Sequence, residues 1–227
     1  MNPAQNTPTH GAVAALRAKT SSTRLQAAMA VGMHPDPRVV TVLVQRCAVE
    51  PDFFVRDMLT WALTRLPEAV TLPRLVAELT SEHAQARSQA LHTLSKINNR
   101  SVYPSIVGTL LRDPDDEVAR TAWRAAVVLV PDGQEKALAA KLVTQLGRGD
   151  RDVWLSLSRA LVGLGEAVMP ALAAGIASSE TRTREHAHAT LLLLEDPDAE
   201  YDALIEEAGR LAARTADPVG EEEEPLC

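Results

Sequence analysis

A pattern that returns about every 32 residues constrains the fold of this chain more than any other feature. Each unit opens at an anchor residue, and successive anchors lie 32, 31, 32, 35 and 30 residues apart. The third and seventh residues after each anchor are small or apolar, which places them on one stripe of a helix. This recurrence indicates stacked repeats. The anchors are Arg24, Arg56, Arg87, Ala119, Trp154 and Arg184, and the stripe positions are Ala27 and Val31, Leu59 and Leu63, Ala90 and Leu94, Ala122 and Ala126, Leu157 and Leu161, and Ala187 and Leu191.

The segment from Asp52 to Leu66 shows the pattern most clearly. It predicts one amphipathic helix, because its apolar residues recur at spacings of three and four. Asp52 stands where a carboxylate can accept from free N–H groups and meet the positive end of the helix dipole. The predicted apolar stripe consists of Val55, Leu59, Ala62, Leu63 and Leu66.

A second helix is predicted in each unit. Five segments align with one another, and four of them begin with proline, which suits the first turn of a helix because its missing N–H is not needed there. Their fifth residues are all small, which predicts that neighbouring helices approach closely at these positions. The segments begin at Pro37, Pro73, Pro104, Lys136 and Pro170, and the small residues are Thr41, Ala77, Gly108, Ala140 and Ala174.

The sequence therefore predicts an all-α fold. We expect a right-handed α-solenoid of about six helix pairs over residues 9–214, since no unit can bury its apolar stripe alone. Residues 1–8 are expected to form a flexible arm. Residues 215–227, with four consecutive glutamates from Glu221 to Glu224, are expected to form an acidic disordered tail. The predicted repeats lie near 21–50, 51–81, 83–113, 115–147, 150–179 and 181–214.

Charge and composition narrow the class of protein. Aromatic residues are only 3% of the chain, which favours helices packed through small side chains. The net charge of −7 argues against general nucleic-acid binding. Residues 1–113 hold 12 Lys and Arg against 8 Asp and Glu, whereas residues 114–227 hold 11 against 22. Without a long apolar stretch, a signal sequence or a metal-binding cysteine spacing, we expect a cytoplasmic protein with no membrane contact and no cofactor.

The opening Asp52-x-x-Val-Arg56, with looser versions at residues 115–118 and 150–153, resembles HEAT repeats. The helix pairs of about 32 residues look like the short HEAT-like repeats named after phycobilisome lyases. This resemblance implies a scaffold or adaptor whose second helices line a concave surface that meets a partner. The residues expected to bind a partner protein are Arg38, Arg46, Arg74, Glu78, Ser105, Thr109 and Lys141.

The arginine anchors allow two interpretations. Arg24, Arg56, Arg87 and Arg184 recur at one position and could form a ladder for anions. The favoured alternative is structural, with each arginine paired to an acidic residue of its own or the next unit, such as Asp52 or Asp57.

Isolated reactive side chains carry no catalytic motif. Cys47 lies beside Arg46, which could lower its pKa, but a cysteine in an apolar helix is more often a core residue. His186 and His188 are two residues apart and point to different helix faces, unlike zinc ligands four apart. Asp57 and Trp61, with Trp123 and Trp154, resemble the residues that HEAT-like DNA glycosylases place in their groove, whereas packing between units is the favoured interpretation.

The main hypothesis is a non-catalytic scaffold that binds a partner protein, with the Arg38, Arg46 and Arg74 region favouring an acidic segment. The first alternative is an enzyme or enzyme subunit of the bilin-lyase type, with Phe53 and Phe54 beside Cys47 as its one aromatic spot. The second alternative is a DNA-binding or glycosylase-type repeat protein. The sequence predicts no metal site and no catalytic residue.

Overall fold

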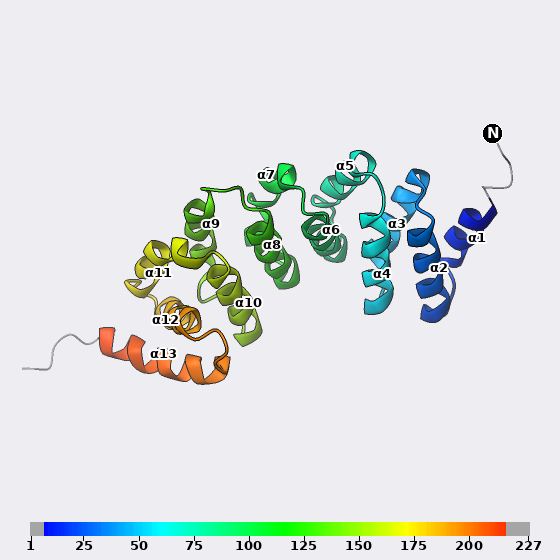
Figure 1. Ribbon diagram of the computed structural model, residues 1–227. Helices are drawn as coiled ribbons and strands as arrows, with labels where there is room; N and C mark the ends of the chain where they lie inside the picture. The colour runs from blue at the N-terminus through cyan, green and yellow to red at the C-terminus, as the bar shows by residue number, and fades with distance from the viewer. Residues whose placement is uncertain (1–6, 217–227) are drawn as a thin grey trace, which may run out of the picture. The chain divides into compact units, whose positions relative to one another are not determined.

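The computed structural model describes residues 7–216, which form thirteen α-helices and five short 3-10 helices and contain no β-strand. The chain divides into two compact units, residues 1–130 and residues 131–227, and each is described by itself (Figure 1). This division falls inside the predicted repeat 115–147, between its two helices. Most of the expected arm and most of the acidic tail, including Glu221–Glu224 and Cys227, lie outside the described residues. The first helix begins at Thr7, inside the segment expected to be a loose arm.

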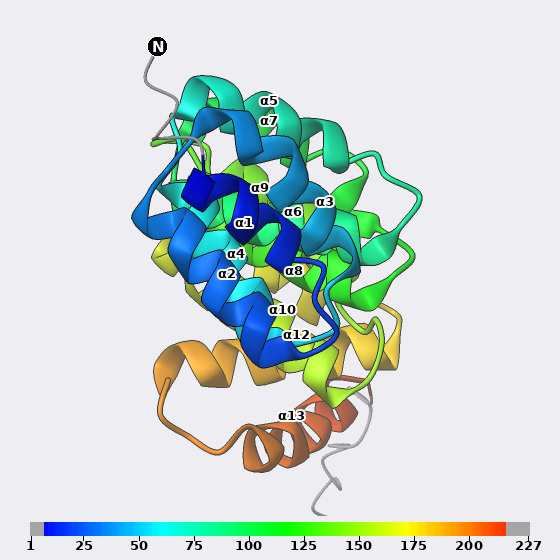
Figure 2. The same ribbon diagram turned by 90° about the vertical axis from the view of Figure 1, so that its right-hand side faces the viewer.

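The first unit has two layers of helices. In Figures 1 and 2 the first helices of successive repeats (α2, α4, α6 and α8) form one layer, and the second helices (α3, α5 and α7) form the other. Helix α1 packs on α2, α2 on α4, and α6 on α8. The bounds are α1 Thr7–Ala15, α2 Ser21–Met33, η2 Pro37–Val39, α3 Val40–Val49, α4 Phe53–Thr64, α5 Glu68–Glu78, α6 Ala84–Ile97, η3 Arg100–Val102, α7 Tyr103–Ile106, η4 Leu110–Arg112 and α8 Asp116–Leu129.

The second unit continues the pairing. Helix α12 packs against α10, α11 and α13 and is therefore the centre of this unit. In the described part of the chain no single helix is long and apolar enough to cross a membrane; α10 and the η6–α11 segment meet that test only together, across a bend of 116°. The bounds are α9 Glu135–Leu142, η5 Val143–Gln145, α10 Arg151–Val162, η6 Gly165–Val168, α11 Met169–Ile176, α12 Thr181–Glu195 and α13 Tyr201–Ala216.

The apolar stripes of the first helices form the core, as predicted. The four stripe residues in α4 are buried, and so are Leu66 just beyond its end and the two stripe positions of α2, α6, α8 and α10. In α12 Ala187 is buried and Leu191 is half-buried. Asp52 accepts from the backbone N–H of Val55, so its predicted role as the N-terminal cap of α4 is confirmed. The chain thus has the paired, all-α architecture that its period predicts.

The second helices differ from the prediction in two ways. Helix α5 begins at Glu68, so Pro73 lies inside it rather than in its first turn. The segment predicted as one helix from Pro104 breaks after Ile106, where Gly108 and the β-branched Val107 and Thr109 lower the helix propensity.

The small fifth residues of the second helices do not form a close seam. Ala77, Gly108, Ala140 and Ala174 are exposed, and Thr41 is half-buried. The reason is helical geometry: Ala77 is two residues from the buried Leu75, so the two point to opposite sides of α5. The prediction that these residues are where helices approach closely is therefore wrong.

The arginine anchors hold the turn that leads into each first helix. In all four cases Nη1 donates to the carbonyl oxygens six and five residues earlier, at 2.8–3.2 Å. Each guanidinium therefore satisfies backbone acceptors that a turn leaves free. The structural interpretation of this column is confirmed, but the partners that all four arginines share are backbone carbonyl oxygens and not the expected acidic side chains. The acceptor pairs are Ala18 and Lys19 for Arg24, Glu50 and Pro51 for Arg56, Ser81 and Glu82 for Arg87, and Ser178 and Ser179 for Arg184.

Two anchors also reach an acidic residue 26 positions later, but it is not Asp52 or Asp57. Arg24 makes a two-bond ion pair with Glu50 at 2.7 Å, and Arg87 does the same with Asp113 at 2.8 Å. Glu50 also accepts from Arg46. Burial raises the pKa of Glu50, but the hydrogen bonds from Arg24, the Asp52 N–H and Arg46 outweigh it and lower the pKa to about 2.

We predict that Glu50→Gln lowers the free energy of unfolding by about 3–5 kcal/mol, because it leaves the buried Arg24 guanidinium without its carboxylate. Urea unfolding followed by circular dichroism measures this change. The control is Arg38→Ala, which removes an exposed ion pair with Asp36 and should change the stability far less, because solvent screens an exposed pair. Equal effects of the two substitutions would contradict the importance of the Arg24–Glu50 pair.

Candidate functional site

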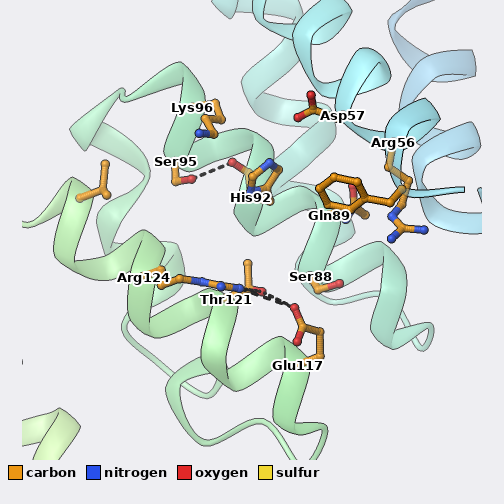
Figure 3. A pocket seen from close by; sticks show the side chains of 12 residues that line it. Arg56, Asp57, Ser88, Gln89, His92, Ser95, Lys96, Glu117, Thr121 and Arg124 are labelled. Carbon is orange, nitrogen blue, oxygen red and sulfur yellow. Dashed lines mark hydrogen bonds and ion pairs between the residues drawn. The ribbon is translucent and has the colours of Figure 1, made fainter. Parts of the chain in front are cut away.

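The first unit has a hollow of about 450 Å³ on the outer face of its first helices, which we call the α4–α6–α8 groove. Its lining residues lie outside the apolar stripe of each helix, and two of them, Ser88 and Thr121, are themselves buried. Figure 3 shows its side chains meeting from the three helices. Helix α4 supplies Phe53, Arg56 and Asp57; α6 supplies Ser88, Gln89, His92, Ser95 and Lys96; and α8 supplies Glu117, Thr121, Arg124 and Val128.

The groove carries charges of both signs. Arg124 donates to Thr121 Oγ1 at 3.0 Å and lies 3.5 Å from a Glu117 carboxylate oxygen. The side chains of Lys96 and Asp57, by contrast, make no hydrogen bond or ion pair with any residue that the structure describes. Lys96 is therefore a cation that an incoming group can reach without displacing a partner.

His92 lies between Asp57 of α4 and Arg124 of α8 (Figure 3). Burial lowers its pKa, and the positive charges of Lys96 and Arg124 lower it further, while Asp57 acts in the opposite direction. The imidazole is therefore neutral at pH 7. Cations outweigh the one acid at this point of the groove.

Exposed apolar side chains border the same face. Phe53 and Phe54 are 66% and 70% exposed and meet edge to face, with ring centroids 5.6 Å apart. Trp61 lies across α2, where a Cβ on Gly32 would come within 2.1 Å of its ring. Met29 and Met33 of α2 are also exposed. Large exposed apolar side chains on one face are typical of interaction surfaces.

The residues predicted to bind a partner lie elsewhere. Apart from Lys141, which belongs to α9 of the second unit, they lie on the second-helix side of the first unit. Arg38, Arg74, Ser105, Thr109 and Lys141 are exposed and Glu78 is half-buried. Arg46 is held by Glu50. The role of this surface stays a prediction.

The sequence contained a signal for the groove that the prediction did not use. Phe53, Asp57 and Trp61 follow one another at intervals of four on the polar face of α4. Aromatic residues at that spacing, opposite a complete apolar stripe, cannot all join the core. They indicate an interaction surface on the first helices.

Cys47 belongs to the core. Its side chain is 4% exposed, and burial raises the pKa of its thiol to about 12. Phe53 and Phe54 are exposed, so they do not form a single aromatic pocket around this thiol. The interpretation of Cys47 as a small core residue is confirmed.

We predict that Cys47 resists thiol reagents in the folded protein. In a Cys227→Ser variant at pH 8 only about one Cys47 thiol in 10⁴ is ionised at such a pKa. Ellman's reagent should therefore react at least 100-fold more slowly than in urea. Rapid labelling without denaturant would contradict the burial of this thiol.

The three tryptophans do not meet on one surface. Trp123 is fully buried and donates to the carbonyl oxygen of Leu111 at 2.9 Å. Trp154 of the second unit is buried and stacks on His186, with ring centroids 4.5 Å apart. Packing explains both residues, and only Trp61 is accessible beside Asp57.

His186 is the centre of a buried polar network in the second unit. Its Nδ1 accepts from the Gly147 N–H at 3.0 Å, and its Nε2 lies 3.1 Å from both the Trp154 carbonyl oxygen and Ser158 Oγ. Burial lowers its pKa to about 3. Because Nδ1 accepts a hydrogen bond, the neutral His186 imidazole carries its proton on Nε2. Nε2 therefore cannot accept a proton from the Ser158 hydroxyl, and His186 cannot act as the base for a Ser158 nucleophile. In the described chain no three His, Cys, Asp or Glu side chains group as metal ligands.

We predict that His186 makes the protein sensitive to acid. The pKa of His186 is about 3 in the folded protein and about 6.5 in the unfolded chain. The contribution of His186 to the free energy of unfolding is therefore fully present above pH 6.5 and is lost as the pH falls toward 3. The loss from this group at pH 5 should be about 2 kcal/mol. Urea unfolding at pH 7 and pH 5 should show a smaller pH dependence for His186→Gln than for wild type, while the exposed His83→Gln matches wild type. Equal pH dependence in all three proteins would refute the assignment.

Comparisons with known proteins concern the fold. No protein-family model matches the sequence, and no curated protein matches it significantly. Among solved structures, human deoxyhypusine hydroxylase has a TM-score of 0.47 at 17% identity, with 93% of this chain and 96% of that chain covered. An engineered protein has a TM-score of 0.44 at 21% identity, with 88% and 97% covered. The complex of CpcE and CpcF of phycocyanin lyase from Nostoc has a TM-score of 0.41 at 23% identity, with 89% and 81% covered.

These solved structures are what the chain is similar to in fold. The helix pairs and the buried stripes described above are the basis for its repeat architecture, and likeness at these identities concerns the fold and not the function.

Proposed function

We propose that this protein is a non-catalytic scaffold that binds a segment of a partner protein in the α4–α6–α8 groove. One observation carries the proposal: the groove joins accessible charges from three helices that share one packed core with the exposed ring of Phe53. Such a surface is formed before binding, so little conformational entropy is lost when a partner docks.

The lining of the groove favours a peptide over a bilin or another large apolar cofactor. Ten of its twelve residues are polar or charged, and Phe53 and Val128 are the apolar ones. Pockets for apolar small molecules are lined mostly by hydrophobic side chains with a few polar groups. The groove's mixed charges and its serine, threonine and glutamine side chains can form ion pairs and hydrogen bonds with the backbone and the polar side chains of a bound peptide.

Nucleic acid is also disfavoured. Residues 1–130 hold 14 Lys and Arg against 11 Asp and Glu, an excess of only three positive charges. Asp57 and Glu117 stand within the groove itself, where they would repel phosphates. The second-helix surface of Arg38, Arg74, Ser105 and Thr109 is the alternative face for the same function.

Photocrosslinking tests which face of the first unit binds the partner. We expect p-benzoylphenylalanine in place of Phe53 to form a discrete adduct with a partner in extract of the cells that make the protein; the change keeps the phenyl ring, and the exposed position leaves room for the added benzoyl group. The same group in place of Ser105, exposed on the second-helix side, should not. Mass spectrometry identifies the adducts. An adduct only from position 105 would move the site to the second helices, and absence of an adduct from both positions would count against the scaffold.

A further inference from the structure

We propose that the α4–α6–α8 groove is specific for an acidic amphipathic segment, with a carboxylate beside His92 and Lys96 and a large apolar side chain against Phe53. This inference rests on the proposed function and names the chemistry of the partner.

The first argument is the distribution of available charge. The cations Arg56, Lys96 and Arg124 face the groove from all three helices, against the acids Asp57 and Glu117. Glu117 already lies 3.5 Å from Arg124 and 3.7 Å from Arg120, so much of its charge is compensated. An entering carboxylate meets Lys96 without having to break an existing ion pair. Charge complementarity of this kind steers and orients a partner.

The second argument is the aromatic anchor. The Phe53 ring is 66% exposed, and the Arg56 guanidinium carbon lies 6.0 Å from its centroid. A leucine or phenylalanine of the partner would cover this ring and remove apolar surface from water, which favours binding. At the other end, Val128 is 48% exposed and offers a second apolar contact. A segment that carries acids between apolar residues satisfies both features.

The third argument is proton linkage at His92. Arg56, Asp57, Lys96, Glu117 and Arg124 are the charged groups that line the groove with it, and Lys96 and Arg124 disfavour its protonated form. A bound carboxylate would offset these cations and favour the imidazolium. Protonation would then accompany binding, so the affinity should increase as the pH falls.

Synthetic peptides test the specificity on the full chain by fluorescence polarisation. The probe is fluorescein-labelled Ser-Glu-Glu-Leu-Phe-Glu-Asp-Leu-Gly-Ser. Its first control has Gln and Asn in place of the acids, its second has Ser in place of the apolar residues, and its third is a labelled DNA duplex. We expect the first peptide to bind at least about tenfold more tightly than either peptide control, with an affinity that falls as salt rises.

Substitutions on the two faces of the first unit test where the acidic peptide binds. Lys96→Glu should weaken the acidic peptide about tenfold, and Asp57→Asn, which removes an opposing charge, should strengthen it. Arg74→Glu on the second-helix side is the matched charge reversal and should have no effect. Circular dichroism checks that each variant is folded. Loss of binding in Arg74→Glu but not in Lys96→Glu would place the peptide on the other face and overturn the proposal.

The pH dependence separates His92 from general charge effects. Wild type should bind the acidic peptide about three- to tenfold more tightly at pH 5.5 than at pH 7.5, and His92→Gln should lose this ratio whatever its affinity at pH 7.5. Equal binding of the neutral peptide, tighter binding of the duplex, or no binding of any probe would each overturn the acidic specificity. A crosslink from position 53 to a native partner, without peptide binding, would leave the scaffold standing and remove only this inference.

Discussion

One interaction recurs at four of the six first helices: an arginine binds the backbone of the turn before the helix. Such a turn leaves carbonyl oxygens without a helical partner, and an unpaired acceptor costs about 1–3 kcal/mol where it is buried. Arg24, Arg56, Arg87 and Arg184 satisfy two such oxygens each. The guanidinium suits this position because it has five donors and stays charged. The recurring arginines, which in the sequence could have formed an anion-binding site, thus donate to carbonyl oxygens of the protein's own backbone.

The groove follows from the same register. Because each first helix buries one stripe, its opposite stripe must face outward, and adjacent first helices bring three such stripes together. The groove residues Phe53 and Arg124 are exposed, whereas His92 is half-buried and Ser88 and Thr121 are buried. The proposed recognition surface and the apolar stripe therefore occupy different sides of the same helices. A change in the groove can alter binding with little effect on the core.

Much of the fold could be predicted from the sequence, because the buried stripe and the capping residue are local features. Leu59 and Leu63 are buried and Asp52 caps α4, as the helical period requires. The second helices were harder to predict, since alignment by proline placed Pro73 in a first turn although α5 begins earlier. The groove was not predicted, because it depends on which side chains of three different helices meet. Spacing within one helix contains no information on the distance between His92 and Arg124.

The buried polar residues described in the first helices join neighbouring repeats. Ser158 in α10 pairs with Thr190 in α12 at 2.7 Å, and Thr60 in α4 lies 3.3 Å from Thr93 in α6 at the corresponding repeat positions. These hydroxyls join neighbouring first helices, and so they belong to the stack rather than to a reacting centre. A catalytic pair needs a base that can take up a proton near neutral pH and a substrate that can reach it. His186 meets neither condition, since it is fully buried with a pKa of about 3. His92 is accessible in the groove, where the lining holds three cations, the acids Asp57 and Glu117, hydroxyl groups and the Phe53 ring. Because the cations outnumber the acids, this lining supports the proposed recognition of an acidic segment.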